Sequence, residues 1–434
     1  MRFDLSKSWR DRAAAVIPGG AHAQAKADSE YPQFSPGFIV RGEGCRVWDL
    51  DGNEFIEFSS GNRSVSLGHA FPPIVDAVIA ELAKGVNFTR PMPIEVIAAE
   101  ELLDAVPMSD MVKFCKNGSD ATSAAVRLAR AATGRDVIAY CQDHPFFSFD
   151  DWFVTTTPLC RGIPAAVNRW SRPFRFNDIA SLNQVFTDHP GDVAAVILEP
   201  ARHDEPQPGF LDQVRDLCDR HGAVLIFDEL ITGFRWHRGG GQAVYGVRPD
   251  LSCWGKCMAN GFSVSALSGT RDLMRLGGTA DSPPKVFLLS TTHGAEPHAL
   301  AAAIATMRFY REHPVIETLT AQGQRLRAGC DAAIRSHGLE RHVEIIGRPC
   351  CLSYITRDAA GEPSPVMRAI FLQETIRRGI LASSLVVNYS HRDADIDAAI
   401  DAIDGTLAVY RQAIDSDPSR FLIGAAPQPI YRRS

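Results

Sequence analysis

The chain has 434 residues, of which 45% are hydrophobic and 22% are charged. This composition is typical of globular proteins and excludes disordered, collagen-like and coiled-coil chains. With 45 basic and 51 acidic residues, the formal net charge is −6. A nucleic-acid partner is therefore not expected, because non-specific binding to nucleic acid needs a broad basic surface.

The sequence also indicates a compartment. It contains no apolar run of the roughly 18 residues that a membrane-spanning helix needs, and its N-terminal segment is charged throughout, without the apolar core of a signal peptide. We expect a cytoplasmic protein with no membrane partner. The ten cysteines are scattered without a CxxC pair and the histidines have no zinc spacing, so we expect free thiols and no metal site.

The middle of the chain alternates short β-branched runs with segments of helical apolar spacing. The runs that indicate buried strands are Val112–Cys115, Val137–Tyr140, Ala194–Leu198, Ala223–Phe227 and Leu251–Trp254. This alternation predicts an α/β fold, with a mostly parallel central sheet and helices on both faces. Ligands of such sheets bind beyond the carboxyl ends of the strands, so the residues that follow these runs carry most weight.

The two ends of the chain have a different pattern. Strand-like runs lie at Phe38–Val40, Arg46–Trp48, Val343–Ile346 and Cys351–Ile355, and a long alanine-rich helix is expected at His298–Glu312. The N-terminal runs predict a small β element that packs with the C-terminal part. We expect a large α/β domain over residues 59–310, and a smaller α+β domain formed by residues 1–58 and 311–434.

The first candidate for chemistry is the segment Lys116–Thr122, directly after a predicted strand. Gly118 lets the backbone approach a ligand closely, and Ser119 or Asp120 can cap the helix that follows. The free N–H groups of its first turn would suit a phosphate. An ordinary capped helix would have the same sequence pattern.

The second candidate is the pair Asp228 and Glu229, which ends the apolar run Leu225–Phe227. A carboxylate at low dielectric is costly unless a cation or a protonated heterocycle faces it. Neighbouring strand residues point to opposite faces, so only one of the two needs to enter a site. A converging glycosidase-type pair is disfavoured for the same reason, and a strand-end cap is the structural alternative.

The third candidate is Lys256, which follows the predicted strand Leu251–Trp254 among apolar and small residues. Desolvation disfavours the charged form of a lysine and frees its amine as a nucleophile. The alternative is a lysine that extends to solvent. An anion-binding loop, a strand-end carboxylate and a desolvated lysine together meet the needs of pyridoxal 5′-phosphate (PLP): a phosphate site, a partner for the ring nitrogen and a Schiff-base lysine.

The sequence resembles the class III, fold-type I aminotransferases, and within them the glutamate-1-semialdehyde 2,1-aminomutase branch. The matching motifs extend over nearly the whole chain: Ile17–Gly20, Trp48–Glu54, Leu67–His69, Asn117–Thr122, Glu199-Pro200, Phe227–Arg235, Gly240–Ala243, Pro249–Leu251, Gly255-Lys256 and Thr292–Pro297. The resemblance implies a fold-type I PLP-transferase fold for the α/β core.

The resemblance also implies roles for single residues toward the cofactor. Lys256 would be the Schiff-base lysine and Asp228 the partner of the pyridine nitrogen, while Leu230 would pack on one face of the ring. Gly118 and Ser119 would bind the phosphate.

Two further cofactor contacts depend on loops. Thr292 would reach the phosphate of the neighbouring subunit, which implies a homodimer. The aromatic residue that stacks on the cofactor lies in a Tyr-His-Gly stretch in the family, but this region reads Asp143–Ser148 here. Phe146 is the first choice for that role and Phe147 the second, with an ordinary core aromatic as the alternative.

The sequence departs from the aminomutase pattern where the substrate would bind. Lys26 replaces an arginine, Gly61–Ser66 replaces a tryptophan-bearing stretch, Leu385–His391 is a shortened segment, and Gly294–Pro297 replaces Ser-Gly-Asn-Pro. Within these segments the side chains of Asn62, Arg63, Asn388 and His391 could donate hydrogen bonds to hydroxyl groups, although surface polar residues would look the same.

These observations predict a ping-pong aminotransferase with small-molecule substrates. The amino donor would be glutamate, as is usual in the family, and the acceptor an aldehyde or ketone, for example a sugar derivative. The first alternative is an aminomutase that acts on glutamate-1-semialdehyde or a similar compound. A non-catalytic relative that serves as a scaffold is the second.

Overall fold

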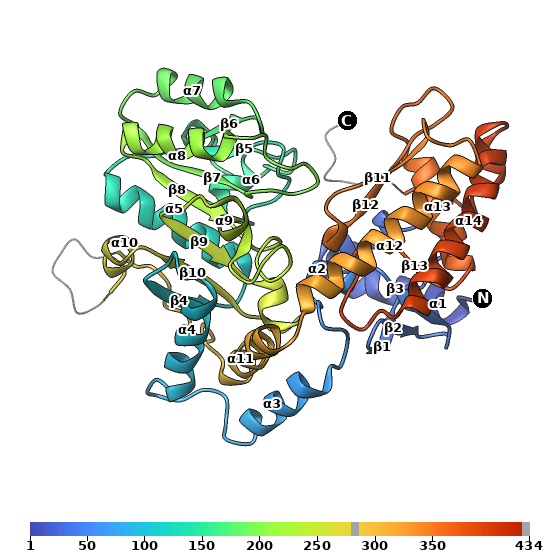
Figure 1. Cartoon of the computed structure of the whole chain (residues 1–434), viewed down its shortest axis with the longest axis horizontal. Helices are drawn as coiled ribbons and strands as arrows, with labels where there is room; N and C mark the ends of the chain where they lie inside the picture. The colour runs from blue at the N-terminus through green and yellow to red at the C-terminus, as the bar shows by residue number, and fades with distance from the viewer. Residues whose placement is uncertain (279–285, 428–434) are drawn as a thin grey trace. The chain divides into compact units, whose positions relative to one another are not determined.

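The computed structural model describes residues 1–278 and 286–427 (Figure 1). Within these residues the chain forms two compact units. Unit 1 combines residues 1–71 with 317–427, and unit 2 contains residues 72–278 and 286–316. The two chain ends therefore belong to one unit and the middle of the chain to the other.

Unit 2 is built on a seven-stranded sheet with the order β4-β10-β9-β8-β7-β5-β6. The strands are β4 (Met111–Cys115), β5 (Val137–Cys141), β6 (Ser171–Phe174), β7 (Val193–Leu198), β8 (Val224–Asp228), β9 (Leu251–Trp254) and β10 (Ser265–Gly269). Neighbouring strands from β9 to β6 are parallel, and β10 is antiparallel to both β9 and β4. The predicted mostly parallel sheet is confirmed.

The sequence reasoning missed two strands of this sheet, and in each case the amino-acid composition of the strand explains why. Edge strand β6 contains Pro173, which cannot donate a ladder hydrogen bond. Strand β10 reads SALSG, a run of small and polar residues, so it lacks the β-branched signal of its neighbours.

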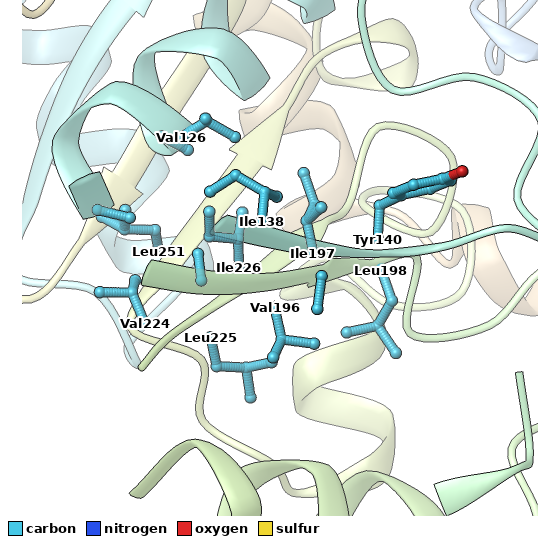
Figure 2. Packing of buried hydrophobic residues seen from close by; sticks show 14 of the residues in the cluster. Val126, Ile138, Tyr140, Val196, Ile197, Leu198, Val224, Leu225, Ile226 and Leu251 are labelled. Atoms are coloured by element: carbon cyan, nitrogen blue, oxygen red, sulfur yellow. The ribbon is translucent and has the colours of Figure 1, made fainter. Parts of the chain in front are cut away.

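Helices cover both faces of this sheet. They are α3 (Pro72–Leu82), α4 (Pro93–Ala105), α5 (Gly118–Thr133), α6 (Asp151–Val154), α7 (Ile179–Asp188), α8 (Phe210–His221), α9 (Gly240–Tyr245), α10 (Arg271–Arg275) and α11 (Pro297–Glu312), with short 3₁₀ turns at Ala165–Trp170 and Lys256–Ala259. Figure 2 shows Ile138, Ile197 and Ile226 on the same side of the sheet as Val126 of α5, while Val196 and Leu225 point the other way. Every residue of β7 and β8 is buried, as expected for parallel strands covered on both faces.

Unit 1 contains a four-stranded sheet of order β1-β2-β3-β13 and the antiparallel pair β11-β12. The strands are β1 (Ile39–Glu43), β2 (Arg46–Asp49), β3 (Glu54–Glu57), β11 (Val343–Ile346), β12 (Ser353–Thr356) and β13 (Ile380–Leu381). Strand β13 is parallel to β3, with Ile380 opposite Ile56. This pairing joins the two chain ends in one sheet and confirms that the N-terminal β element packs with the C-terminal part.

The helices of unit 1 surround these strands. They are α1 (Asp4–Val16), α2 (Ser60–Arg63), most of α12 (Val315–Ser336), α13 (Pro365–Arg377) and α14 (Asp393–Ile414), with 3₁₀ turns at Pro18–Gly20, Gln24–Lys26, Asp28–Glu30, Pro349–Cys351 and Pro418–Arg420. The expected strand Cys351–Ile355 is shifted, because Pro349 starts a 3₁₀ turn through Cys351 and the strand begins at Ser353. In the described part of the chain, no helix combines the length and apolarity needed to cross a bilayer.

Candidate active site

The loop after β4 is shaped to receive an anion. Asn117 precedes α5, and its N–H donates to the Asp120 carboxylate at 2.8 Å. A Cβ added to Gly118 would lie 2.5 Å from the Leu230 side chain, so only glycine allows this close packing. Gly118 begins the helix and Ser119 is its second residue, in the first turn, where free N–H groups and the helix dipole favour negative charge.

The Asp228 carboxylate lies at the carboxyl end of another strand, β8, in the same sheet. It is the last residue of β8 and is 3% exposed. One of its oxygens accepts a hydrogen bond from the Leu230 N–H at 3.0 Å. Burial raises the pKa of this carboxyl well above its ordinary value, the negative charge of Glu199 raises it further, and Lys256 lowers it. Burial therefore disfavours the ionised form of Asp228 unless a positive charge faces it.

Lys256 lies beyond the end of β9, which is the parallel neighbour of β8. Cys253 of β9 pairs with Asp228, and Lys256 follows three residues later. Its φ of +47° places it in the left-handed region, at a cost of about 1–2 kcal/mol for a non-glycine residue. A Cβ on the preceding Gly255 would lie 2.6 Å from the Ser265 hydroxyl and 2.7 Å from Leu230. The backbone that carries Lys256 is therefore packed tightly against β10 and the Asp228 loop.

The donor set of unit 2 fits PLP. A helix N-terminus with a glycine suits its phosphate, the amine of Lys256 suits its aldehyde, and a buried carboxylate short of positive charge suits a protonated ring nitrogen. Leu230 contacts both Gly118 and Gly255 through these close approaches, so it lies between the phosphate loop and the lysine. Sequence reasoning predicted these residues, and the structure brings them together.

Sequence reasoning gave no role to Glu199, which lies beside Asp228, or to His144, which contacts Glu199. Glu199 directly follows β7, in register beside the end of β8, and is 4% exposed with one carboxylate oxygen lacking a hydrogen-bond partner. Its N–H donates to Nδ1 of His144 at 3.0 Å. Burial lowers the pKa of His144, so its ring is neutral and carries its proton on Nε2. The position of Glu199 after a predicted strand was the available signal.

Glu229 turns away from Asp228, as expected for neighbours on a strand. Its fully buried carboxylate accepts hydrogen bonds from the backbone N–H groups of Gly241 and Gln242, at 2.7 and 2.8 Å, and from the Thr232 hydroxyl. Burial raises its pKa to about 7. Glu229 thus fixes the start of α9 and does not converge with Asp228 across a substrate.

The aromatic candidates after β5 differ in exposure. Phe146 is 46% exposed, and its ring meets Phe153 edge-on with centroids 5.8 Å apart. Phe147 is 1% exposed and belongs to the core, so its ring is not free to cover a ligand. Phe149, which sequence reasoning did not consider, is 59% exposed, and its N–H donates to the Ser119 hydroxyl at 3.2 Å. Phe146 stays the candidate, with Phe149 as a second exposed ring beside the phosphate loop.

Thr292 lies in the loop before α11. Its side chain is exposed, and its carbonyl oxygen accepts a hydrogen bond from the Asn87 side chain at 3.4 Å. The contact with the phosphate of a second subunit, which the family resemblance implies, stays a prediction.

The predicted substrate residues all belong to unit 1, and the structure separates them into two groups. Lys26 and Asn62 line a cavity of about 470 Å³, together with Tyr31, Glu57 and His69. The His69 ring nitrogen lies 3.5 Å from the Glu57 carboxylate. This cavity offers both donors and acceptors to a polar ligand.

Asn62 reaches this cavity from an unusual backbone. Residues 60–63 all have φ between 44° and 69°, although only one of them is glycine. The Ser60 hydroxyl anchors this left-handed turn by donating to the Val386 carbonyl at 3.1 Å, and the Arg63 N–H closes it on the Ser59 carbonyl at 2.9 Å. Arg63 is not among the residues that line the cavity. Such strained segments are common at functional sites.

Asn388 and His391 are buried, with exposures of 0% and 2%. The Asn388 N–H donates to Nδ1 of His391 at 3.0 Å, and the Asn388 side chain accepts from the Ser390 N–H at 3.1 Å. Burial lowers the pKa of His391 to about 4. These two residues stabilise their own loop, and neither lines the 470 Å³ cavity.

Comparison with known proteins identifies the family. The sequence profile of the family described as "Aminotransferase class-III" matches residues 27–148 and 166–404. The chain belongs to the class III aminotransferases. The family and the fold type that the resemblance predicted are confirmed, and PLP is the cofactor of this family.

The relatives carry two kinds of name. The glutamate-1-semialdehyde 2,1-aminomutase of Desulforamulus reducens is 32% identical over 422 residues, which cover 92% of this chain and 96% of the relative. An aminopentol aminotransferase of Sphingopyxis macrogoltabida is 39% identical over 341 residues, covering 77% and 78%. Among solved structures, the PLP-containing FumI protein of Sphingopyxis sp. MTA144 superimposes with a TM-score of 0.88 at 31% identity, covering 98% of this chain and 99% of FumI.

Proposed function

We propose that this class III enzyme transfers an amino group from a donor, glutamate, to an aldehyde or ketone acceptor that carries hydroxyl groups, in a ping-pong reaction with PLP. The observation that carries the proposal is the arrangement of Gly118, Asp228 and Lys256 at the strand ends of one sheet, with Leu230 packed between the two loops.

The residues that would hold the cofactor follow from this arrangement. Gly118 and Ser119, at the start of α5, would bind the phosphate, and Leu230 and Phe146 would cover the ring. Thr292 would reach the phosphate of a second subunit. When bound, PLP supplies an electron-withdrawing ring and an aldehyde that accepts amino groups.

The chain itself supplies the proton chemistry. Asp228 becomes stably ionised only opposite a positive charge, so it would hold a proton on the ring nitrogen. Lys256 would anchor the cofactor through its Nζ and, once released, take the substrate α-proton at the same atom as a general base. Its backbone is fixed, because Gly255 is tightly packed and Lys256 begins a 3₁₀ turn, so the side chain starts from one position.

The hydroxylated acceptor is supported by the unit 1 cavity. Its lining mixes the Asn62 amide, the Ser59 and Tyr31 hydroxyls and the buried Glu57 carboxylate, and Lys26 supplies a cation. Buried polar groups of this kind favour a ligand that satisfies their hydrogen bonds and penalise one that cannot. A relative is named for an aminopentol, an amine that carries hydroxyl groups.

An aminomutase is the second candidate, because several relatives at 32% identity carry that name. A strict mutase turns over without an external donor. The departures from the aminomutase pattern at Lys26 and at the left-handed turn favour the aminotransferase.

A homodimer and a cytoplasmic location complete the proposal. Unit 2 exposes large apolar side chains on and after α3, namely Ile79, Leu82, Val86 and Phe88, and also Val96 of α4. Such a group of exposed apolar residues marks a protein interface, and a second copy of the chain would cover it. The ten cysteines all lie within the described residues and form no disulfide, which suits a reducing compartment.

The test uses the purified full-length chain loaded with PLP. Glutamate alone should convert the cofactor to its amino form with release of 2-oxoglutarate, and a panel of aldehydes and ketones should reverse the change. Turnover of glutamate-1-semialdehyde without a donor, and of nothing else, would instead establish the mutase. Failure of glutamate and every other amino donor would contradict the aminotransferase.

A further inference from the structure

An ion pair links the phosphate loop to the loop before α11. The ammonium of Lys116 contacts the Glu296 carboxylate, whose other oxygen lies 3.6 Å from Nδ1 of His293. The Glu296 side chain is 18% exposed and that of Lys116 39%. The hydrogen bond from Lys116 holds the pKa of Glu296 below its ordinary value, so the carboxylate is ionised at neutral pH.

Both partners are close to the groups that would bind phosphate. Lys116 lies two residues before Gly118, a Cα separation of at most about 7.6 Å along the chain. Its backbone is fixed there, because its carbonyl accepts a hydrogen bond from the Ser263 hydroxyl. Glu296 stands directly before α11, and its contact with the Lys116 ammonium places it beside the same loop. Opposite charges are therefore held next to the start of the predicted phosphate loop.

The negative member of this pair is unexpected at such a place. A carboxylate near a phosphate weakens its binding unless a cation offsets it. Lys116 is the cation in contact. The two residues thus act on a bound phosphate with opposite sign.

We propose that the Lys116–Glu296 pair sets the affinity of the enzyme for its phosphate-bearing cofactor, with Lys116 strengthening and Glu296 weakening the hold on the phosphate. The inference rests on the proposed function. A merely structural ion pair would behave differently, because loss of either partner would loosen the same loops and weaken binding in both cases.

The experiment measures the binding of pyridoxamine phosphate and of inorganic phosphate to the apoprotein by titration calorimetry. Pyridoxamine phosphate forms no covalent bond with Lys256, so its dissociation constant measures non-covalent binding alone. Glu296→Gln should lower that constant three- to tenfold and Lys116→Gln should raise it by about the same factor, the scale of one partly screened charge. Both shifts should shrink at 0.5 M salt.

Two controls separate charge from structure. Lys116→Arg keeps the charge and should stay within twofold of the wild type. Glu101→Gln makes the same change in net charge at another ion pair with α11, where Glu101 contacts Arg308 and Arg311 at 2.6 and 2.9 Å, and it should leave both constants unchanged. Thermal unfolding of each variant verifies that it is folded.

The outcomes are distinct. Shifts of the same sign in Glu296→Gln and Lys116→Gln, or no shift above twofold, would overturn the role of the pair while leaving the aminotransferase intact. A wild-type protein that binds neither ligand would contradict both proposals.

Discussion

The proposed cofactor residues and the proposed acceptor residues are held by different kinds of backbone. In unit 2, Asp228 ends β8 and Lys256 follows β9, and every residue of these two neighbouring parallel strands is buried. In unit 1, Asn62 stands in a left-handed turn and Lys26 in a short 3₁₀ turn. Strand ends in a packed sheet leave little room for change, whereas turns at a cavity can be rebuilt without disturbing a core. The proposed acceptor residues of unit 1 could therefore change without altering the proposed cofactor residues of unit 2.

The largest effect is expected for Lys256→Ala. This change removes the amine that anchors the cofactor and moves the α-proton, so transamination should fall at least about 1,000-fold. Stopped-flow absorbance of the donor half-reaction measures it. Alanine keeps the Cβ and therefore the same backbone strain as Lys256, so the variant should be about as stable as the wild type. Residual activity near that of the wild type would show that another residue does this chemistry.

Asp228→Asn should lower the rate of the donor half-reaction about 100-fold, because a neutral amide cannot hold a proton on the ring nitrogen. The matched change Glu229→Gln acts on the carboxylate that fixes α9. It should cost about 1–3 kcal/mol of stability and much less rate once the protein is folded. If both variants lost rate equally, the assignment of different roles to the two carboxylates would be contradicted.

The pH dependence of apoprotein stability follows from the same residue. The pKa of Asp228 is raised on folding above 3.8, so the folded state keeps a proton that the unfolded state loses as the pH rises. The free energy of unfolding should therefore fall from about pH 4 toward neutrality. Asp228→Asn should remove part of this fall, which urea denaturation at pH 5 and pH 8 would reveal. An apoprotein that is equally stable at both values, with or without the substitution, would argue against the buried, uncompensated carboxylate.

In unit 1, Asn62→Gly should separate stability from selectivity. Glycine adopts a positive φ without strain, so the protein should gain about 0.5–1 kcal/mol. The loss of the amide should reduce kcat/KM for D-glyceraldehyde about tenfold relative to propanal and leave the donor half-reaction unchanged. Ala70→Gly relaxes another left-handed residue, which does not line the cavity, and should alter stability only. An unchanged preference for D-glyceraldehyde in Asn62→Gly would remove Asn62 from the acceptor site.

The smallest effect on catalysis is expected for Asn388→Ala and His391→Ala. Both side chains are buried and accept backbone hydrogen bonds: His391 from the Asn388 N–H and Asn388 from the Ser390 N–H. Their loss should lower the free energy of unfolding by about 1–3 kcal/mol. The KM of the acceptor should stay within twofold. If a fully folded variant showed a larger change in KM, Asn388 or His391 would again be a candidate substrate contact.

Much of the fold and of the cofactor side could be predicted because physical rules act locally there. The apolar runs of β7, β8 and β9 indicate buried strands, and the polar residue after each run must lie at one edge of the sheet. Gly118, Asp228 and Lys256 were found in this way. Glu199 obeys the same rule and was missed because no candidate chemistry demanded a second carboxylate.

The acceptor side was less predictable because its chemistry depends on exposure. Asn62, Asn388 and His391 are equally polar in the sequence, yet of these three only Asn62 lines the 470 Å³ cavity. The exposure of Phe149 and the burial of Phe147 likewise depend on a loop that has no periodic pattern. The left-handed turn had no signal apart from Gly61, because three of its four residues rarely adopt such a backbone.

The antiparallel strand β10 has a consequence for the nascent chain. Strand β4, which leads into the phosphate loop, pairs with β10, for example through Cys115 and Ser265. Among the described residues, β10 is the only partner strand of β4. At about 5–20 residues per second, a ribosome needs roughly 8–30 s to make the intervening segment. Throughout that time β4 has an open edge, which is a site for misassembly. A chaperone would therefore matter most while the chain is still being synthesised.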